Sequence, residues 1–424
     1  MNGSNRPRAW QFAAGAIVLA LAGCDGPRDS LQSKTDAQIP QFEPHPQSLS
    51  ALAGVGATRH AMIGGDSVTS GVIHFLTIIG NGDDSRLALL DTNDAGDSFA
   101  SPVWVSEEGA SVSSHGENRP ALIVTPDVIY AAWNQGGDIR LARSLSWGAS
   151  FEQPVRISDK PPADFSGYVS IGVAPDGDVY AVWLDTRDRE NGQEVYSLYL
   201  ARSHDRGATF GSNVRVAAHV CECCRPNVTF GSDNQVLVFW RHIYPGSVRD
   251  MTVAVSTDRG ETFGTPVRIA EDNWKVEGCP DSGVALARSG NRAYAAWLTE
   301  AAPSTRGVRL TWSDDAGQTW APAVRASQEI LDANYPAMSA SDGRVELAFQ
   351  GRSPDKDAGW ARTSTFLVEI GNDGKLSRPI AVPGISSPVS RPAILAATYG
   401  RVFVAWTGMQ DGTQTVFFSR ARHE

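Results

Sequence analysis

A short motif, Ser/Thr-x-Asp-x-Gly-x-Thr/Ser-aromatic, recurs along this chain of 424 residues. Four copies are complete, at 92–99, 203–210, 256–263 and 313–320, and a fifth at 144–151 has Ser146 in place of the Asp. The Asp can accept hydrogen bonds from backbone N–H groups of its own turn. The Gly can adopt the positive φ that a tight hairpin needs. The aromatic side chain can fold back into an apolar layer, so the motif predicts a self-closing turn between two strands.

Each motif belongs to a longer repeat that contains a strand ending in Trp or another bulky residue. These strands are expected at 72–78, 128–133, 178–183, 235–240, 292–297, 344–349 and 401–406. From Trp133 onward their ends are 50, 57, 57, 52 and 57 residues apart, the length of a four-stranded blade with its loops. We therefore predict an all-β fold over 51–424, a β-propeller of seven four-stranded blades, with six blades as the alternative because the first unit is the least regular.

The last repeat has only three evident strands before the chain reaches Glu424. A strand from the N-terminal side, expected at 47–54, would complete this blade and close the ring. Closure would remove the exposed sheet edges that otherwise invite aggregation.

The repeated motif resembles the Asp box of the sialidase-like β-propellers, also called bacterial neuraminidase repeat proteins. The resemblance implies that the Asp residues of the motif are structural and lie far from the active site. Sialidases have six blades, hold the carboxylate of sialic acid with three arginines from different blades and use a tyrosine nucleophile. Their first-blade motif, Phe/Tyr-Arg-Ile-Pro, is absent from this sequence.

Propeller topology places the start of each first strand and the end of each second strand on one face, opposite the Asp motifs. The first-strand starts are predicted to converge on the mouth of the central channel: His60, Arg119, Tyr168, Arg225, Asp281, Tyr335 and Arg391. Residues that follow the second strands join the same face: Asp185, Arg187, Arg241, Glu300 and Arg352.

Three of these residues, Arg119, Arg225 and Arg391, precede Pro at equivalent positions. A guanidinium matches a carboxylate bidentately, so these arginines, with Tyr168, are candidate ligand-binding residues. The alternative is a structural role, in which each arginine pairs with a neighbouring carboxylate.

For a sialidase-like reaction, the sequence offers Tyr335 as nucleophile and Asp185 or Asp281 as acid. A tyrosine nucleophile needs a carboxylate to accept its proton, and Glu300 is the candidate for that role.

Four cysteines are expected near the channel mouth: Cys221, Cys223, Cys224 and Cys279. An even number suits two structural disulfides, one of which would join the adjacent pair 223–224. The alternative is a soft-metal site for copper or zinc, with His219 or His242 nearby, although Cys-x-Cys-Cys matches no common zinc-ribbon spacing.

The N-terminus has the features of a lipoprotein signal peptide at 1–23. Arg6 and Arg8 precede the apolar run 11–21, which is too short to span a membrane, and Leu21-Ala22-Gly23-Cys24 resembles a bacterial lipobox. The resemblance implies lipidation of Cys24, a flexible tether at 24–50 and a location in the cell envelope facing the periplasm or the surface.

Charge argues against a nucleic-acid partner. Without residues 1–23 the chain carries 35 basic and 47 acidic residues, a net charge of −12, and the sequence has no basic stripe. Three functions remain: a monomeric, membrane-tethered module that binds a glycan, a partner protein or a metal at the channel mouth; an exo-glycosidase of sialidase type; or a scaffold in envelope assembly.

Overall fold

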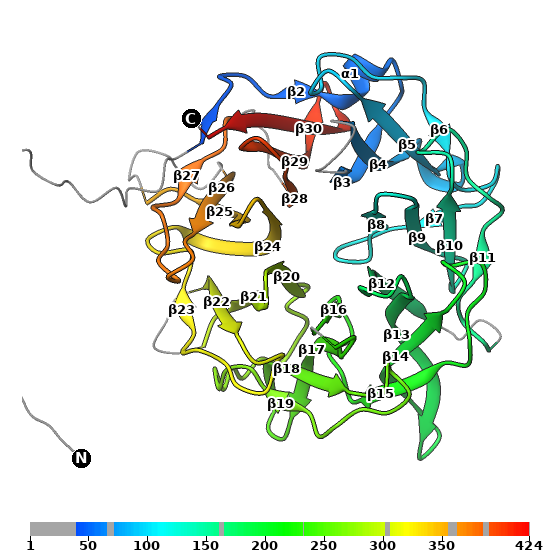
Figure 1. Ribbon diagram of the computed structural model, residues 1–424, viewed down its shortest axis with the longest axis vertical. Coiled ribbons are helices and arrows are strands. Elements are labelled where there is room, and N and C mark those ends of the chain that lie inside the picture. The colour runs from blue at the N-terminus through cyan, green and yellow to red at the C-terminus, as the bar shows by residue number, and fades with distance from the viewer. Residues whose placement is uncertain are drawn as a thin grey trace, which may run out of the picture. The chain divides into compact units, whose positions relative to one another are not determined.

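The computed structural model describes residues 40–423, except 66–71, 161–164, 232, 302–305, 355–362 and 385–389 and the side chain of Asp83. These residues belong to a compact unit, Ala37–Glu424. Seven antiparallel sheets follow one another around a central axis, as the blades of a β-propeller do (Figure 1). The prediction of seven blades is confirmed, and the six-bladed alternative is wrong. None of the helices in the described part of the chain is long and apolar enough to cross a membrane.

The strands of the first three blades have the following bounds. Blade 1 contains β3 (Thr58–Gly65), β4 (Ile73–Ile79), β5 (Arg86–Thr92) and β6 (Val103–Trp104), with the 3-10 turn η1 (Gly82–Asp84) between β4 and β5. Blade 2 contains β7 (Val112–Ser113), β8 (Ala121–Val124), β9 (Ile129–Gln135), β10 (Asp138–Ser144) and β11 (Val155–Arg156). Blade 3 contains β12 (Ser166–Val173), β13 (Val179–Glu190), β14 (Gln193–Ser203) and β15 (Val214–Ala218).

The next three blades repeat the same order. Blade 4 contains β16 (Asn227–Phe230), β17 (Val236–Tyr244), β18 (Val248–Ser256) and β19 (Val267–Arg268). Blade 5 contains β20 (Val284–Ser289), β21 (Arg292–Thr299), β22 (Gly307–Ser313) and β23 (Val324–Arg325). Blade 6 contains β24 (Leu331–Ser341), β25 (Arg344–Arg352), β26 (Ser364–Ile370) and β27 (Ile380–Ala381).

Blade 7 closes the ring with strands from both ends of the described chain. It contains β28 (Ser390–Ala396), β29 (Arg401–Gln410) and β30 (Thr413–Arg422), and β30 pairs with β1 (Gln41–Phe42) and β2 (Gln47–Ser48). The N-terminal strand therefore completes the last blade as expected, and β1 and β2 lie within the stretch 24–50 that was expected to be a tether. The expected strand 47–54 is wrong beyond Ser48, because Ser48 caps helix α1 (Leu49–Ala53), which ends at Gly54 with a φ of 64°.

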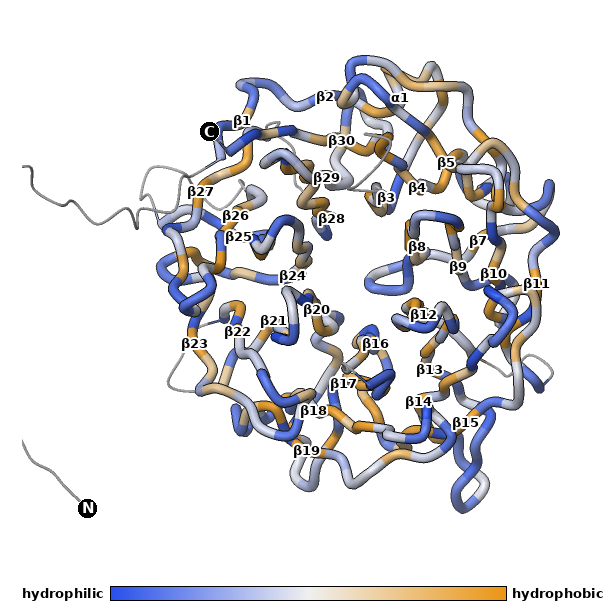
Figure 2. Tube along the Cα trace, viewed as in Figure 1, coloured by the Kyte–Doolittle hydropathy of each residue, from blue (hydrophilic) through white to orange (hydrophobic). Residues whose placement is uncertain are grey.

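Large aromatic side chains fill the layers between blades. Trp133, Trp183, Trp240, Trp297 and Trp406, near the ends of the second strands, are all among the largest fully buried side chains. Trp240 of blade 4 belongs to one apolar cluster with Val182 and Leu184 of blade 3. The apolar stretches accordingly follow the strands, whereas polar residues gather in the connecting loops (Figure 2). These tryptophans are core residues, so burial of their indole rings accounts for the repeat.

The five repeated motifs form turns, which we call the Asp turns (92–99, 144–151, 203–210, 256–263 and 313–320). In one of them Asp258 accepts hydrogen bonds from Ser256 Oγ at 2.7 Å and from Thr262 N at 2.9 Å, while Gly260 has a φ of 90°. Hydrogen bonds from Thr262 and Ser256 lower the pKa of Asp258 to about 2. In the fifth copy Ser146 Oγ accepts the equivalent bond from Ser150 N at 3.1 Å.

The strand register separates the two faces of the ring. In blade 3, Ser166 pairs with Asp185 and Asp185 with Ser197, whereas Val173 pairs with Val179 and Val179 with Ser203. The start of the first strand and the end of the second thus lie at one face, and the Asp turn that follows Ser203 lies at the other.

Candidate functional site

A tight turn covers the mouth of the central channel. The innermost strand of blade 2 is split into β7 and β8, which both pair with β9, and the segment between them projects toward the ring axis (Figure 1). Within it His115 and Asn118 exchange backbone hydrogen bonds of 3.1 and 2.8 Å, and Gly116 has a φ of 56°. A Gly with positive φ at the first central position is typical of a tight, type II′ turn. We call residues 115–118 the capping turn.

The capping turn reaches blade 5 on the far side of the channel. Glu117 N donates to Asp281 Oδ1 at 3.1 Å, a contact between residues 164 apart in the sequence. A Cβ atom added to Gly116 would lie only 2.5 Å from Asp281 Oδ1, so this approach requires glycine. The carboxylate of Asp281 therefore holds blade 2 and blade 5 together over the channel.

Asp281 also orients an arginine from blade 7. Arg391 Nη2 donates to Asp281 Oδ2 at 2.6 Å and to the Tyr335 hydroxyl at 3.3 Å, and the guanidinium carbon lies 4.5 Å from the centre of the Tyr335 ring. Arg391 Nε is 3.9 Å from Glu117 Oε1. Burial raises the pKa of Tyr335; Arg391 opposes this effect, and Asp281 and Glu117 add to it. Tyr335 is therefore a protonated phenol at neutral pH.

Two further residues, His60 and Arg119, belong to the channel mouth. Burial and the charges of Arg119, Arg391, Arg59 and His115 lower the pKa of His60 to about 3, so its imidazole is neutral at pH 7. Arg119 adjoins the capping turn, where its backbone N–H donates to Glu117 O at 3.0 Å. We refer to His60, Glu117, Arg119, Asp281, Tyr335 and Arg391 as the mouth cluster.

Several polar atoms of the mouth cluster make no hydrogen bond in the described structure. The Nε atoms of Arg119 and Arg391 and Oε1 of Glu117 are buried and have no hydrogen-bond partner among the described residues. Buried polar groups in native proteins are nearly always hydrogen-bonded, and each exception needs a physical reason. Two guanidinium groups with spare donors at one channel mouth can donate hydrogen bonds to the oxygens of an anion.

The backbone at the mouth is strained. His60, Tyr168, Asp281, Tyr335 and Arg391 have positive φ values of 55°, 57°, 47°, 52° and 47°. A side chain in this region costs on the order of 1–3 kcal/mol, and such residues cluster at functional sites. Five of the seven predicted first-strand starts share this conformation. It arises at irregularities of the inner strands, such as the register shifts after Arg59, Gly167 and Ser390.

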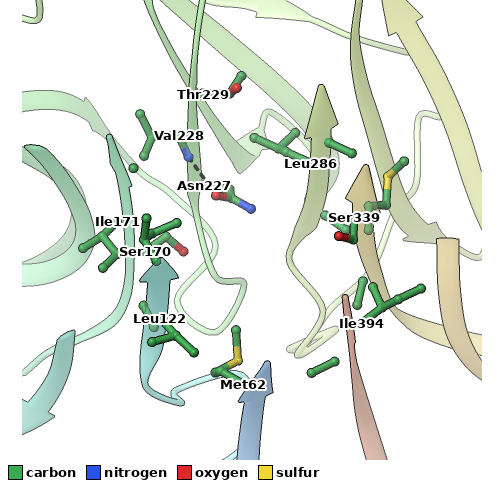
Figure 3. A pocket seen from close by; sticks show the side chains of 18 of the residues that line it. Met62, Leu122, Ser170, Ile171, Asn227, Val228, Thr229, Leu286, Ser339 and Ile394 are labelled. Atoms are coloured by element: carbon green, nitrogen blue, oxygen red, sulfur yellow. Dashed lines mark hydrogen bonds between the residues drawn. The ribbon is translucent and has the colours of Figure 1, made fainter. Parts of the chain in front are cut away.

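Below the mouth, the seven inner strands line a cavity of about 580 Å³. Its lining includes apolar residues such as Met62, Leu122, Ile171, Leu286 and Ile394 (Figure 3). The polar residues Glu117, Arg119 and Arg225 also line it. The channel wall therefore offers both polar and apolar surface below the charged mouth.

Two of the predicted ligand-binding residues are committed to protein contacts. Arg225 is 8% exposed and donates to Ser170 Oγ at 2.9 Å and to the carbonyls of Pro120 and Val169, so it joins the inner strands of blades 2, 3 and 4. Burial lowers its pKa to about 9. Tyr168 is buried, its backbone N–H donates to Asn118 Oδ1 at 2.9 Å, and burial, with the nearby Asp281 charge, raises its pKa.

The remaining candidate carboxylates lie apart from this cluster. Asp185 is 1% exposed and accepts hydrogen bonds from Ser166, Trp183 and Arg187 of its own blade. Glu300 is exposed just beyond the end of β21. The carboxylates with the largest effect on the Tyr335 pKa are Asp281 and Glu117, rather than Glu300.

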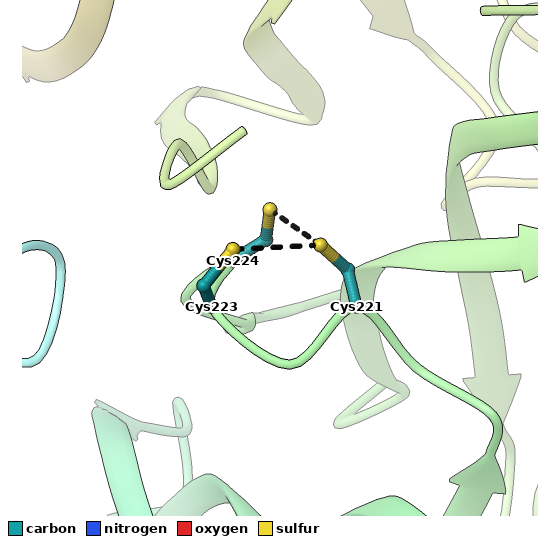
Figure 4. A group of neighbouring side chains, drawn as sticks. All are labelled: Cys221, Cys223 and Cys224. Atoms are coloured by element: carbon teal, nitrogen blue, oxygen red, sulfur yellow. Dashed lines mark hydrogen bonds between the residues drawn. The ribbon is translucent and has the colours of Figure 1, made fainter. Parts of the chain in front are cut away.

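The cysteines form one disulfide and a pair of thiols. Cys223 is bonded to Cys279, whereas Cys221 and Cys224 are buried free thiols whose sulfurs are 2.9 Å apart (Figure 4). The pairing 223–224 is therefore wrong. The sulfurs of Cys221, Cys223 and Cys224 lie within 4.8 Å of one another, but the disulfide leaves only two of them available to a metal. Copper or zinc binding stays a prediction.

Similar structures share the ring but little sequence. No protein-family model matches the sequence, and no curated protein does. The polysaccharide lyase Uly1 is 12% identical, with 93% of this chain and 95% of that chain covered and a TM-score of 0.52. An ulvan lyase of polysaccharide lyase family 25, bound to -[GlcA(1-4)Rha3S]-, is 11% identical over 86% and 94% of the two chains, with a TM-score of 0.51. The Hadza microbial sialidase Hz136 is 15% identical over 74% and 68%, with a TM-score of 0.49.

The chain has a seven-bladed β-propeller fold, which resembles that of these two lyases. At identities this low the likeness shows the fold alone, so the chemistry of the propeller must be argued from its own residues.

Sequence reasoning missed the capping turn. Glu117 and Asn118 contribute to the mouth as much as the predicted residues do, and His115 adds its ring 6.0 Å from that of Tyr168. The only signal was the polar stretch Ser114-His115-Gly116-Glu117-Asn118 just before Arg119. Cys24 and the signal peptide lie outside the described residues.

Proposed function

We propose that the propeller binds an acidic glycan at the channel mouth, with Arg119 and Arg391 holding a carboxylate of the sugar. The observation that carries this proposal is that the buried Nε of each arginine makes no hydrogen bond in the described structure, although Arg391 Nε lies at ion-pair distance, 3.9 Å, from Glu117 Oε1. Asp281 fixes the orientation of Arg391, which lowers the entropy lost when a ligand binds. The rings of Tyr335 and His115 supply faces against which a sugar ring can pack.

The arginines and carboxylates of the mouth cluster balance one another in charge. Arg391 faces the two carboxylates of Glu117 and Asp281, so the mouth discriminates by geometry rather than by a broad positive field. A single carboxylate that accepts from both arginines fits this arrangement better than a polyanion. The overall acidic charge of the chain points the same way.

The test is equilibrium binding of three oligosaccharides to the purified protein: one that contains glucuronate, one that ends in sialic acid and one that is neutral. Arg119→Gln and Arg391→Gln should each weaken binding of the acidic ligand at least tenfold, since loss of a charged hydrogen bond costs about 1.5–3 kcal/mol. The matched control is Arg206→Gln, which removes one exposed positive charge from the Asp-turn face. Equal weakening by all three variants, or equal binding of the neutral ligand, would contradict the proposal.

A second candidate is an exo-glycosidase of sialidase type. The observation that favours it is the hydroxyl of Tyr335, which is held by Arg391 next to the carboxylates of Asp281 and Glu117. Tyr335 would attack the anomeric carbon, Asp281 or Glu117 would accept its proton, and the other would protonate the leaving group. Asp185 and Glu300 would then have no part in the reaction. The raised pKa of Tyr335 makes proton transfer to a carboxylate the demanding step.

A measurement of glycoside hydrolysis distinguishes the binding module from the exo-glycosidase. A fluorogenic sialoside and a fluorogenic glucuronide should both remain intact with the binding module, and the acidic ligands should still bind. Release of the fluorophore that Tyr335→Phe abolishes, without loss of ligand binding, would establish the enzyme instead.

We further propose that the protein is a monomer tethered to a bacterial envelope membrane through lipid on Cys24. The support is the sequence alone: the apolar run 11–21 followed by Leu21-Ala22-Gly23-Cys24. Incorporation of radiolabelled palmitate into the full chain, lost in Cys24→Ala, is expected. Labelling that survives the substitution would overturn the tether.

A further inference from the structure

The cysteine cluster places a free dithiol against a disulfide. Cys221 Sγ lies 2.9 Å from Cys224 Sγ and 3.9 Å from Cys223 Sγ, and Cys223 is bonded to Cys279 (Figure 4). Cys221 and Cys224 have the Cys-x-x-Cys spacing of dithiols that form disulfides readily. Three sulfurs from one turn of chain therefore stand within reach of thiol–disulfide exchange without any large movement.

The environment activates one sulfur of the pair. Arg249 Nη1 donates to Cys221 Sγ at 3.2 Å and to Glu222 at 2.9 Å, and Arg241 is buried close by. Burial opposes ionisation of Cys221, but the hydrogen bond from Cys224 and the charges of Arg241 and Arg249 outweigh it and lower the pKa of Cys221 to about 7. Burial and the neighbouring Cys221 raise the pKa of Cys224. An attacking thiolate and a protonated reserve thiol are the two roles that exchange needs.

We propose that this cluster is a thiol–disulfide exchange site, in which the disulfide moves between the pair Cys223–Cys279 and the pair Cys221–Cys224. The Cys221 thiolate attacks Cys223 Sγ, the bond to Cys279 breaks, and Cys279 leaves as a thiolate that takes up a proton from water. Cys224 then loses its proton and attacks Cys221 Sγ, which releases Cys223 as a thiol. One disulfide is consumed and one is formed, so no outside oxidant or reductant takes part.

The leaving group is well placed for this step. Cys279 lies in an exposed stretch of blade 5, whereas Cys221 and Cys224 are each 1% exposed. Water can therefore solvate the departing Cys279 thiolate, while the attacking pair stays shielded from other thiols. A buried pair can exchange internally at a rate set by its own geometry rather than by encounter with a partner.

Thiol–disulfide exchange would affect the mouth cluster. Asp281 follows Cys279 by two residues, and its backbone N–H donates to Cys223 Sγ at 3.3 Å. Its carboxylate carries the contacts to Glu117 N and Arg391. Release of Cys279 removes the covalent anchor of this stretch, so the exchange site is a switch for the position of Asp281. The effect on ligands rests on the proposed function, but the exchange itself does not.

The test traps the released thiol in the folded protein. The full chain is incubated with N-ethylmaleimide under native conditions, quenched in acid and digested with trypsin. Cys279 lies in the fragment 276–288 and the other three in the fragment 216–241, because the Arg225–Pro226 bond resists trypsin. We expect maleimide on Cys279 to accumulate with time, together with a 216–241 fragment that has lost its link to 276–288.

Variants assign the steps. Cys221→Ser should slow the labelling of Cys279 at least tenfold, whereas Cys224→Ser should preserve it and accumulate a Cys221–Cys223 bond. Arg249→Gln should slow labelling severalfold, because loss of the guanidinium raises the pKa of Cys221 and leaves less of it as thiolate. Arg268→Gln, which removes a guanidinium of the same blade that pairs with Asp250, is the matched control and should label at the wild-type rate.

Two results would overturn the proposal. Labelling of Cys279 that is as fast in Cys221→Ser and Arg249→Gln as in the wild type would mean that Cys221 does not attack. Permanent linkage of the two fragments in folded wild-type protein, at every time and with Cys221 and Cys224 both alkylated after denaturation, would mean that the disulfide does not move. Should Cys221→Ser fail to fold, the two arginine variants decide alone.

Discussion

Substitution of Gly116 by Ala tests whether the capping turn is docked on Asp281. An added Cβ would lie 2.5 Å from Asp281 Oδ1 and 2.8 Å from Oδ2, so the carboxylate must move. The chain provides its own control in Gly136, which also belongs to blade 2. Gly136 has a φ of 60° against 56° for Gly116, but nothing lies within 4 Å of its added Cβ.

Gly116→Ala and Gly136→Ala both introduce backbone strain, but only Gly116→Ala also breaks contacts of Asp281. An alanine in the left-handed region costs about 1 kcal/mol in either place. Gly116→Ala also displaces Asp281 from Glu117 N, at 3.1 Å, and from Arg391, at 2.6 Å. Each such charged hydrogen bond is worth about 1.5–3 kcal/mol when buried. Because the Asp281 side chain is 29% exposed, we discount the sum to about 1–2 kcal/mol.

The free energy of unfolding in urea, taken from midpoints at a common slope, measures the difference. We expect Gly136→Ala to lose about 1 kcal/mol and Gly116→Ala about 2–3 kcal/mol. Double substitution with Asp281→Ala should bring the Gly116 cost down to that of Gly136, because the clash is then removed. Equal losses in the two single variants would refute the docking of the capping turn across the channel.

Three further predictions concern the Asp turns and His60. Asp258→Ala should lower the free energy of unfolding by about 1 kcal/mol at pH 7, because the turn loses three hydrogen bonds to the Asp258 carboxylate near solvent. Asp258→Ser should lower it less, because Ser146 makes the equivalent hydrogen bond in the fifth turn. The folded pKa of Asp258, about 2, lies below its ordinary value of 3.8, so this stability is present above pH 4 and is lost as the pH falls toward 2. The difference in thermal unfolding temperature between wild type and Asp258→Ala should therefore shrink over that range. A difference that stays constant with pH would contradict the assignment. The pKa of His60 is lowered from 6.5 to about 3, so protonation of the unfolded chain should reduce stability as the pH falls below 6.5. His60→Gln should flatten the pH dependence of unfolding between pH 7 and 5, and an unchanged slope would count against burial of a neutral imidazole.

The repeat determined most of what could be predicted about the ring. Spacing of the Trp-ended strands fixed the blade length, and chain alternation within a blade put Arg391, Asp281 and Tyr335 on one face before any contact was known. The structure brings these three together within hydrogen-bond range. The sequence repeat predicts these positions because every blade buries the same face against its neighbour. Equivalent residues of different blades therefore lie at equivalent places in the ring.

Local irregularities could not be predicted in the same way. Equivalent positions in the repeat gave Arg225 and Arg391 the same role, yet Arg225 turns inward to the carbonyls of neighbouring strands, whereas Arg391 meets Asp281. The capping turn breaks the repeat, so a repeat-based argument passes over Glu117. The choice of Cys279 as the partner of Cys223 likewise depends on how closely two neighbouring blades approach at the rim, which sequence spacing does not determine.

A crystal structure of the protein with an oligosaccharide that contains glucuronate or sialic acid would test the central claim most directly. We expect the sugar carboxylate to lie between Arg119 and Arg391 at the channel mouth, with Tyr335 beside the ring and the capping turn above it. A saccharide bound instead on the Asp-turn face or along the outer strands, with both arginines unchanged, would contradict it.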